Sequence, residues 1–273
     1  MHGRLQMVEG LARLGYVARG VVYLVVGWAA VQAARGSGSP TDTRGALSKI
    51  LDEPFGQVML AVVALGMVGY ALWRGAQALL DVDDHGTDAK GLAVRGGMLV
   101  SAVIHVGLAI AAVTLLAGTG SGGGGDSSTQ DWTAWLLEKP FGRFLVAGVG
   151  LVVIGVAAAH VVKAYRASFM KHITPDPRVR DLLLKAGRAG LAARAVVFAI
   201  VGTFFLVAAW QSDASESGGL GAALRALRDQ PYGPWLLGAV AFGLVAFAIY
   251  SILQGLYRRI DSPEAVRRLK AVT

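Results

Sequence analysis

Hydrophobic residues along this chain gather into six long runs, and short polar segments separate them. The runs cover approximately residues 17–34, 56–80, 94–117, 142–165, 189–210 and 235–257. About 20 helical residues cross the ~30 Å hydrocarbon core of a bilayer. At these lengths only helices satisfy the backbone polar groups within lipid. The pattern therefore predicts an all-α, polytopic membrane protein with six transmembrane helices.

A Pro-aromatic-Gly triplet occurs three times, each time directly before the second run of a pair. The copies are Pro54-Phe55-Gly56, Pro140-Phe141-Gly142 and Pro231-Tyr232-Gly233, spaced by 86 and then 91 residues. Such a period indicates a unit of two helices made three times. We expect repeats at residues 11–82, 90–167 and 180–260, followed by a basic cytoplasmic tail at residues 261–273. Because the three units run in the same sense, they predict a pseudo-threefold bundle about the membrane normal.

A short amphipathic stretch precedes each triplet, with apolar residues at the i, i+3, i+4 spacing of a one-sided helix. The three sets are Leu47, Ile50 and Leu51; Trp132, Trp135 and Leu136; and Leu220, Leu224 and Leu227. We interpret them as interfacial helices at the outer membrane surface. The triplet then marks a structural corner. The proline suits the first turn of the next helix, the aromatic ring anchors among lipid headgroups, and the glycine allows a tight turn.

The composition also indicates lipid as the solvent. Charged residues make up 16% of the chain and hydrophobic residues 54%, whereas soluble domains carry about 25% charged residues. The chain has no cysteine, which excludes disulfides, thiolate catalysis and thiolate-held metals or iron–sulfur clusters. The first run could be a signal peptide, but Arg19 lies within it and Arg194 occupies an equivalent position deep in the chain. We interpret it as a mature helix.

The distribution of lysine and arginine predicts the orientation in the membrane. The N-terminus, the second and fourth loops, the C-terminus and the adjoining helix ends hold 19 of the 26 basic residues. Both termini are therefore expected in the cytoplasm of a bacterial cell, with the protein in the inner membrane. The basic inner loops favour anionic lipids as partners. Nucleic acid is not expected, because aromatic interleaving and a soluble binding fold are missing.

Polar residues within or beside the spans occupy equivalent positions in the repeats and cluster toward the cytoplasmic side. They are Arg19, Arg194, Arg74, His160, Gln77, Lys163 and Gln254. One interpretation is an axial ring that forms an electropositive vestibule for an anion or a lipid headgroup. The other is a set of helix-end residues whose charged tips extend to the interface. His105 is the one titratable residue expected near the middle of the membrane, where we interpret it as a hydrogen-bonded packing residue.

Catalytic, metal and cofactor sites find little support in the sequence. No aspartate or glutamate falls within the six spans, which disfavours ion coupling and acid–base hydrolysis. A shared haem is not expected, because His105 and His160 differ in depth by about 9 Å at 1.5 Å per residue. The aspartates at 81, 83, 84 and 88 lack the bidentate glutamate of a calcium loop and are interpreted as a solvated acidic loop. No enzyme activity, metal or cofactor is expected.

The repeated motifs resemble a known family. Each Pro-aromatic-Gly corner, together with Gly-x-x-x-Arg from Gly15 to Arg19 and from Gly190 to Arg194, resembles the bacterial membrane proteins grouped as domain of unknown function 1206. The middle repeat departs from the pattern, with Ser101 at the arginine position. The resemblance implies six membrane helices and no known activity.

Two classes of function stay open at this point. The first is a non-catalytic membrane scaffold, or a module that interacts with lipids or with protein partners still unknown. The second is a permease or channel for a small solute or anion. The sequence favours the first, because it contains no convincing site in the middle of the membrane.

Overall fold

The computed structural model describes residues 2–120 and 125–257, and in these residues every regular element is helical. The long helices are α1 (His2–Ala34), α3 (Gly56–Leu80), α4 (Ala89–Leu116), α6 (Gly142–Arg166), α7 (Pro177–Gln211) and α9 (Gly233–Tyr257). Each contains a stretch long and apolar enough to span a membrane. The predicted all-α fold with six spans is confirmed. The predicted tail at residues 261–273 lies outside the described residues.

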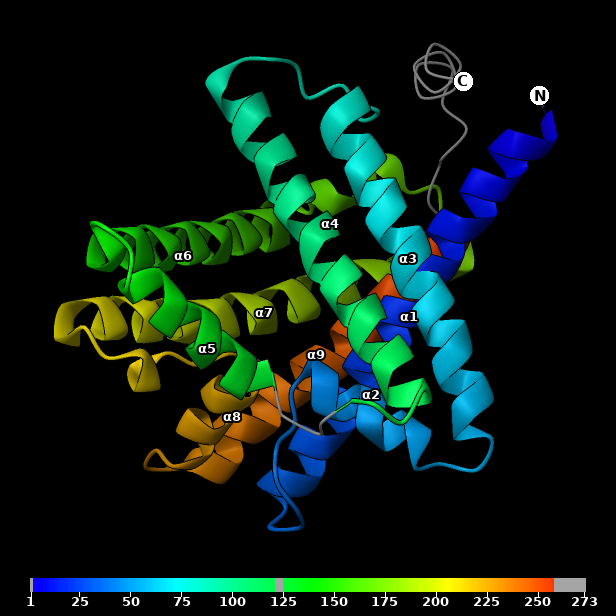
Figure 1. The fold of residues 1–273 in the computed structure, drawn as a ribbon. Coiled ribbons are helices and arrows are strands. Elements are labelled where there is room, and N and C mark those ends of the chain that lie inside the picture. Colours follow the sequence, from blue (N-terminus) through cyan, green and yellow to red (C-terminus); the bar gives the residue numbers. More distant parts are fainter. Residues whose placement is uncertain (1, 121–124, 258–273) are drawn as a thin grey trace.

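The six long helices pack side by side in chain order. α1 packs on α3, α3 on α4, α6 on α7, α7 on α9, and α9 returns to α1. Within the described residues, α4 and α6 of the middle repeat do not form a packed pair. Figure 1 shows the result, with α3 and α4 running up the view and α6 and α7 running across it. The six helices therefore form an open ring with its gap between the two helices of the middle repeat. Because α6 and α7 cross α3 and α4, the helix pairs do not run about one common axis, as the predicted pseudo-threefold bundle required.

Glycines allow the two long helices of the first repeat, and those of the third, to approach each other closely. A Cβ atom on Gly15 would lie 2.6 Å from the backbone nitrogen of Tyr70, and one on Gly190 would lie 2.5 Å from the Cα of Phe247. These pairs are equivalent in the two repeats. The corresponding glycine of the middle repeat is Gly97, and a Cβ there would meet nothing within 4 Å. The backbones thus approach closely in the outer repeats and stay apart in the middle one.

A second crossing point explains why the middle repeat differs. In the first repeat Gly66 lies against Ala18, and in the third Gly243 lies against Ala193. Valines occupy both equivalent positions of the middle repeat, Val100 and Val152, and both are exposed. Small residues allow helices in lipid to approach closely, and two valines at one crossing prevent the same approach. The side chains of Val100 and Val152 therefore account for the separation of α4 and α6.

Three short helices tie the repeats together at one end of the bundle: α2 (Thr43–Leu51), α5 (Gly125–Leu137) and α8 (Leu220–Arg228). The Asp42 carboxylate accepts a hydrogen bond from the Gly125 backbone N–H. The Asp126 carboxylate accepts from the Gly219 N–H at 2.9 Å and from Arg225 at 2.6 Å. The middle repeat is thus fastened to both neighbours at this end, although its long helices stay apart.

The prediction that the apolar faces of these short helices lie at the membrane interface is wrong for two of them. In α2 Leu47 and Ile50 are buried, and in α8 Leu224 is buried, so these apolar faces pack inside the protein. The one-sided pattern is the same whether a helix faces lipid or a protein core. Only α5 keeps exposed tryptophans, Trp132 and Trp135, as an interfacial helix would. Two 3₁₀ turns, η1 (Ser168–His172) and η2 (Ala214–Glu216), complete the fold.

The three Pro-aromatic-Gly corners share one backbone geometry. Phe55, Phe141 and Tyr232 each have φ of 61° or 62°, in the left-handed region that is uncommon for such side chains. The proline precedes this residue and forms part of the turn, so its predicted place in the first helical turn is wrong. The glycine is required because a Cβ on Gly56 would lie 2.2 Å from the Leu51 carbonyl oxygen.

Candidate functional site

Arginines and aromatic rings alternate in one continuous stack at the centre of the bundle. The Arg74 guanidinium carbon lies 5.4 Å from the centre of the Tyr70 ring. Arg19 lies between the Tyr70 and Phe247 rings, at 4.9 and 5.0 Å. Arg194 also lies over the Phe247 ring, at 4.5 Å. Cation–π attraction of this kind strengthens when the groups are desolvated. The stack brings together three of the arginines predicted for the axial ring.

Arg19 fastens three helices to one another. Its side chain is 7% exposed. It donates hydrogen bonds to the Tyr70 hydroxyl on α3, and on α9 to Ser251 at 3.1 Å and to Gln254 at 3.0 Å. Arg19 itself belongs to α1. The position therefore lies inside the protein, and for this residue the interpretation as a helix-end side chain reaching the interface is wrong.

Arg194 has rings around it but no comparable hydrogen bonds. Its guanidinium carbon lies 5.2 Å from the Tyr23 ring and 4.8 Å from the Phe198 ring, in addition to Phe247. Its Nε is buried and lacks a hydrogen-bond partner in the described part of the chain, as does the Nε of Arg19. The difference lies in the terminal nitrogens, which have three acceptors at Arg19 and none at Arg194 among the described residues.

Arg74 and Gln77 connect the stack to the loop after α3. Arg74 donates to the Gln77 amide oxygen at 3.2 Å, and Gln77, fully buried, donates to the Asp83 carboxylate. Asp81 is also buried and accepts from the backbone N–H groups of His85 and Gly86 at 2.7 and 2.9 Å. The predicted solvated acidic loop is therefore wrong at Asp81, which organises the turn.

Both histidines bind the carbonyl of the preceding helical turn. His105 Nδ1 lies 2.7 Å from the Ser101 oxygen and His160 Nδ1 lies 2.8 Å from the Val156 oxygen. Because a carbonyl only accepts, Nδ1 carries the hydrogen in each. The His105 ring packs on Tyr70, with ring centres 4.4 Å apart. Among residues 2–120 and 125–257, no group of three or more histidine or acidic side chains has the arrangement of a metal site.

The predicted set of Gln77, Lys163 and Gln254 divides between the interior and the surface. Gln77 and Gln254 are buried, whereas Lys163 is exposed on α6. The reason is the open middle repeat, which removes α6 from α4. The aromatic partners Tyr70 and Phe247 were not among the predicted site residues. Their equivalent spacing from the triplet prolines, 16 residues in each case, was the signal that could have revealed them.

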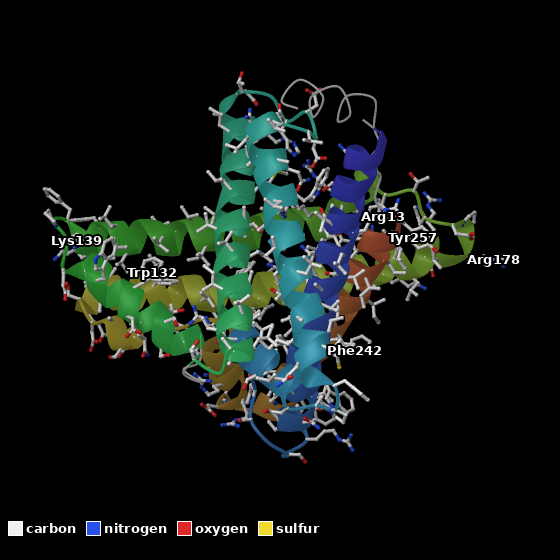
Figure 2. The ribbon with its side chains drawn as sticks, turned by 45° about the vertical axis from the view of Figure 1, so that its right-hand side comes forward. Arg13, Trp132, Lys139, Arg178, Phe242 and Tyr257 are labelled. Carbon is white, nitrogen blue, oxygen red and sulfur yellow. The ribbon has the colours of Figure 1, made fainter. Side chains whose placement is uncertain are left out.

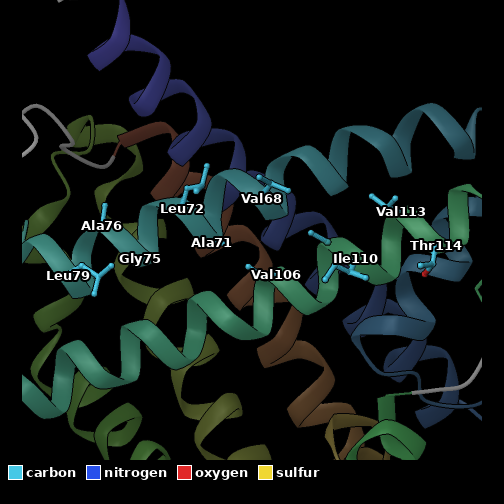
Figure 3. Close-up of a pocket in the computed structure, with 11 residues that line it drawn as sticks. Val68, Ala71, Leu72, Gly75, Ala76, Leu79, Val106, Ile110, Val113 and Thr114 are labelled. Atoms are coloured by element: carbon cyan, nitrogen blue, oxygen red, sulfur yellow. The ribbon is translucent and has the colours of Figure 1, made fainter. Parts of the chain in front are cut away.

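An apolar groove of about 570 Å³ runs between α3 and α4. Figure 3 shows its walls, formed mainly by aliphatic side chains, with Thr114 as the polar exception. Leu72, Val106 and Ile110 are exposed along it. The groove lies on the outside of the ring and does not include the arginine stack.

Comparisons with known proteins agree with this architecture. Residues 14–81, 96–167 and 189–258 each match the family described as Domain of Unknown Function (DUF1206). The chain is 33% identical over 256 residues to the uncharacterized protein YxxB of Bacillus subtilis, covering 93% of this chain and 92% of that protein. No solved structure matches the chain. The six apolar spans indicate a polytopic membrane protein, the three matches in tandem show that it is built from three repeats, and the chain belongs to the DUF1206 family.

Proposed function

We propose that this protein is a non-catalytic membrane module that interacts with lipids or membrane partners and does not conduct solutes. The observation that supports this most is that polar residues at the centre of the bundle form hydrogen bonds between helices. Arg19 joins Tyr70, Ser251 and Gln254 across three helices. Side chains committed to holding helices together cannot also form the wall of a solute pathway without breaking those bonds.

The surface of the middle repeat supports the same proposal. α4 and α6 are the least buried of the six spans. Large apolar side chains such as Val103, Ile110, Leu151 and Phe144 are exposed on them. Extended apolar surfaces of this kind serve contact with lipid or with a partner. No enzyme activity is proposed.

The inner membrane is proposed as the location, with both termini and the anionic-lipid contacts on the cytoplasmic side. Figure 2 shows Lys139 and Arg178 at opposite ends of the α6–α7 pair. Because the chain has no cysteine, single substitutions report topology directly. We expect Ser37→Cys to react with an impermeant maleimide in intact cells, and Thr87→Cys only after permeabilisation. The reverse pattern would contradict the orientation.

Flux measurements test the proposed function. The purified protein is reconstituted in liposomes, and efflux of chloride and of phosphate is recorded for the native chain and for Lys163→Ala. We expect no efflux above that of empty liposomes in either case. Efflux through the native protein that the substitution reduces would contradict the proposal and support the alternative, a permease with a basic cytoplasmic vestibule.

A further inference from the structure

The contact of α7 with α6 repeats the contact of α1 with α9, because in both cases the first helix of one repeat packs on the second helix of another. Arg194 and Arg19 are equivalent, each four residues after Gly190 or Gly15. Arg19 donates one hydrogen bond to Tyr70 on α3, within its own repeat, and two across the α1–α9 contact, to Ser251 and Gln254. By the same equivalence, Arg194 should have one counterpart on α9, within its own repeat, and two on α6.

The three counterparts have different chemistry. Counted from the triplet prolines, Phe247 replaces Tyr70, His160 replaces Ser251 and Lys163 replaces Gln254. Phenylalanine has no hydroxyl group to accept a hydrogen bond. The imidazole of His160 already binds the Val156 carbonyl through Nδ1. Lysine carries a positive charge and only donates. Each acceptor available to Arg19 is thus missing around Arg194.

The contacts around Arg194 agree with this comparison. The Phe198 ring packs on both basic groups, 4.8 Å from the Arg194 guanidinium carbon and 5.3 Å from the His160 ring. Lys163 follows His160 by three residues on α6, so the two side chains lie on the same face of that helix. No hydrogen bond to Arg194 occurs among the described residues. Arg194 therefore has no acceptor, and the neighbouring helix α6 offers it an imidazole and a lysine at the positions that correspond to Ser251 and Gln254.

Carboxylates do not balance this charge. Among the described residues, no aspartate or glutamate forms an ion pair with Arg194. The nearby Lys185 is already paired with Asp181 at 2.8 Å on the exposed face of α7. Desolvated cations without a counter-charge are costly. An external anion would supply both the charge and the missing acceptors.

We propose that the α6–α7 contact binds a phosphate-type oxyanion through Arg194, Lys163 and His160. The inference rests on the proposed lipid-interacting function and names its ligand chemistry. The planar guanidinium of Arg194 can donate two parallel hydrogen bonds to phosphate oxygens. Lys163 adds an ammonium group from the last turn of α6, where it is exposed. The phosphate belongs either to an anionic lipid headgroup or to a free anion.

Calorimetric titration of the purified protein in a zwitterionic detergent tests the site. The probes are short-chain phosphatidylglycerol and inorganic phosphate. Lys163→Gln introduces at this position the residue type found at Gln254, so it removes one cation and supplies an amide acceptor to Arg194. We expect about tenfold weaker binding from the loss of one charge-assisted hydrogen bond. The unfolding temperature should be equal to or above that of the native chain. Lys185→Gln, with the same change in net charge, should bind as the native protein does.

The outcomes separate the ligand sources and the two proposals. Binding of the lipid alone identifies a headgroup, and binding of phosphate alone identifies a free anion; either supports the site if Lys163→Gln weakens it. Lys163→Glu should abolish binding while the protein stays folded, because the glutamate would pair with Arg194. Native binding of neither probe, or equal binding by Lys163→Gln and the native chain, overturns the site. The result of the flux measurement would be unaffected, so the proposed function would stand or fall separately.

Discussion

Replacement of Arg19 by methionine lowers the free energy of unfolding by about 2–4 kcal/mol. Methionine fills most of the volume but donates no hydrogen bond, so the amide oxygen of Gln254 and the hydroxyl of Ser251 lose their donor. Interhelical hydrogen bonds in membranes contribute on average about 0.6 kcal/mol and at most about 1.7, and desolvated cation–π contacts add about 1–2 kcal/mol. Three hydrogen bonds and the contacts with Tyr70 and Phe247 together give this range.

Arg194→Met is the matched control, because it makes the same substitution at the equivalent position. This substitution removes contacts with aromatic rings but no hydrogen bonds, and it also removes a cation that has no counter-charge. We therefore expect a change within about 1 kcal/mol, as for substitutions that remove no paired group. Chemical denaturation of both variants in detergent, followed by circular dichroism, measures the difference. Equal losses for Arg19→Met and Arg194→Met would show that hydrogen bonding does not distinguish the two positions.

Much of the fold could be predicted from the sequence because the length of apolar runs and the spacing of the triplets depend on local chemistry. The six spans, the three repeats and the short helices before each corner all follow from such local patterns. The same patterns did not predict whether the apolar face of each short helix contacts lipid or the protein core. The apolar spacing of Leu47 and Ile50 is satisfied equally by lipid and by the protein core, and only the packing decides between them.

The candidate site was predicted in part. Arg19, Arg74 and Arg194 were predicted to form one ring because all three lie toward the cytoplasmic ends of their spans, and the structure places them in one stack. Two features could not be predicted without knowledge of which helix faces meet. One is the pair of rings between the arginines. The other is the open middle repeat, since Val100 and Val152 acquire meaning only when their counterparts are seen at a helix crossing.

Substitution of the packing glycines should have opposite effects in different repeats. Gly15→Ala places a Cβ 2.6 Å from the backbone of Tyr70, and Gly190→Ala places one 2.5 Å from the backbone of Phe247. Backbone atoms cannot yield as a flexible side chain does, so we expect losses of about 3 kcal/mol for each, at the upper end for overpacking. Gly97→Ala meets open space and should raise stability by up to about 1 kcal/mol through helix propensity.

Thermal unfolding of the three alanine variants in the same detergent compares these effects. The matched design matters because the three glycines occupy equivalent positions within equivalent helices and receive the same methyl group. Loss of stability in Gly97→Ala as large as that in Gly15→Ala would mean that α4 and α6 are packed together in solution. An increase for Gly97→Ala alone agrees with a ring that is open at the middle repeat.

Disulfide formation in native membranes measures the opening itself. The chain has no cysteine, and Ala34→Cys with Gly238→Cys serves as the positive control. The Cβ positions of this pair lie 3.9 Å apart between α1 and α9, close to the ~3.8 Å mean of disulfides. Under mild oxidation this pair should cross-link. Val100→Cys with Val152→Cys should not, because α4 and α6 stay apart. Cross-linking of the second pair at the rate of the control would contradict the open ring.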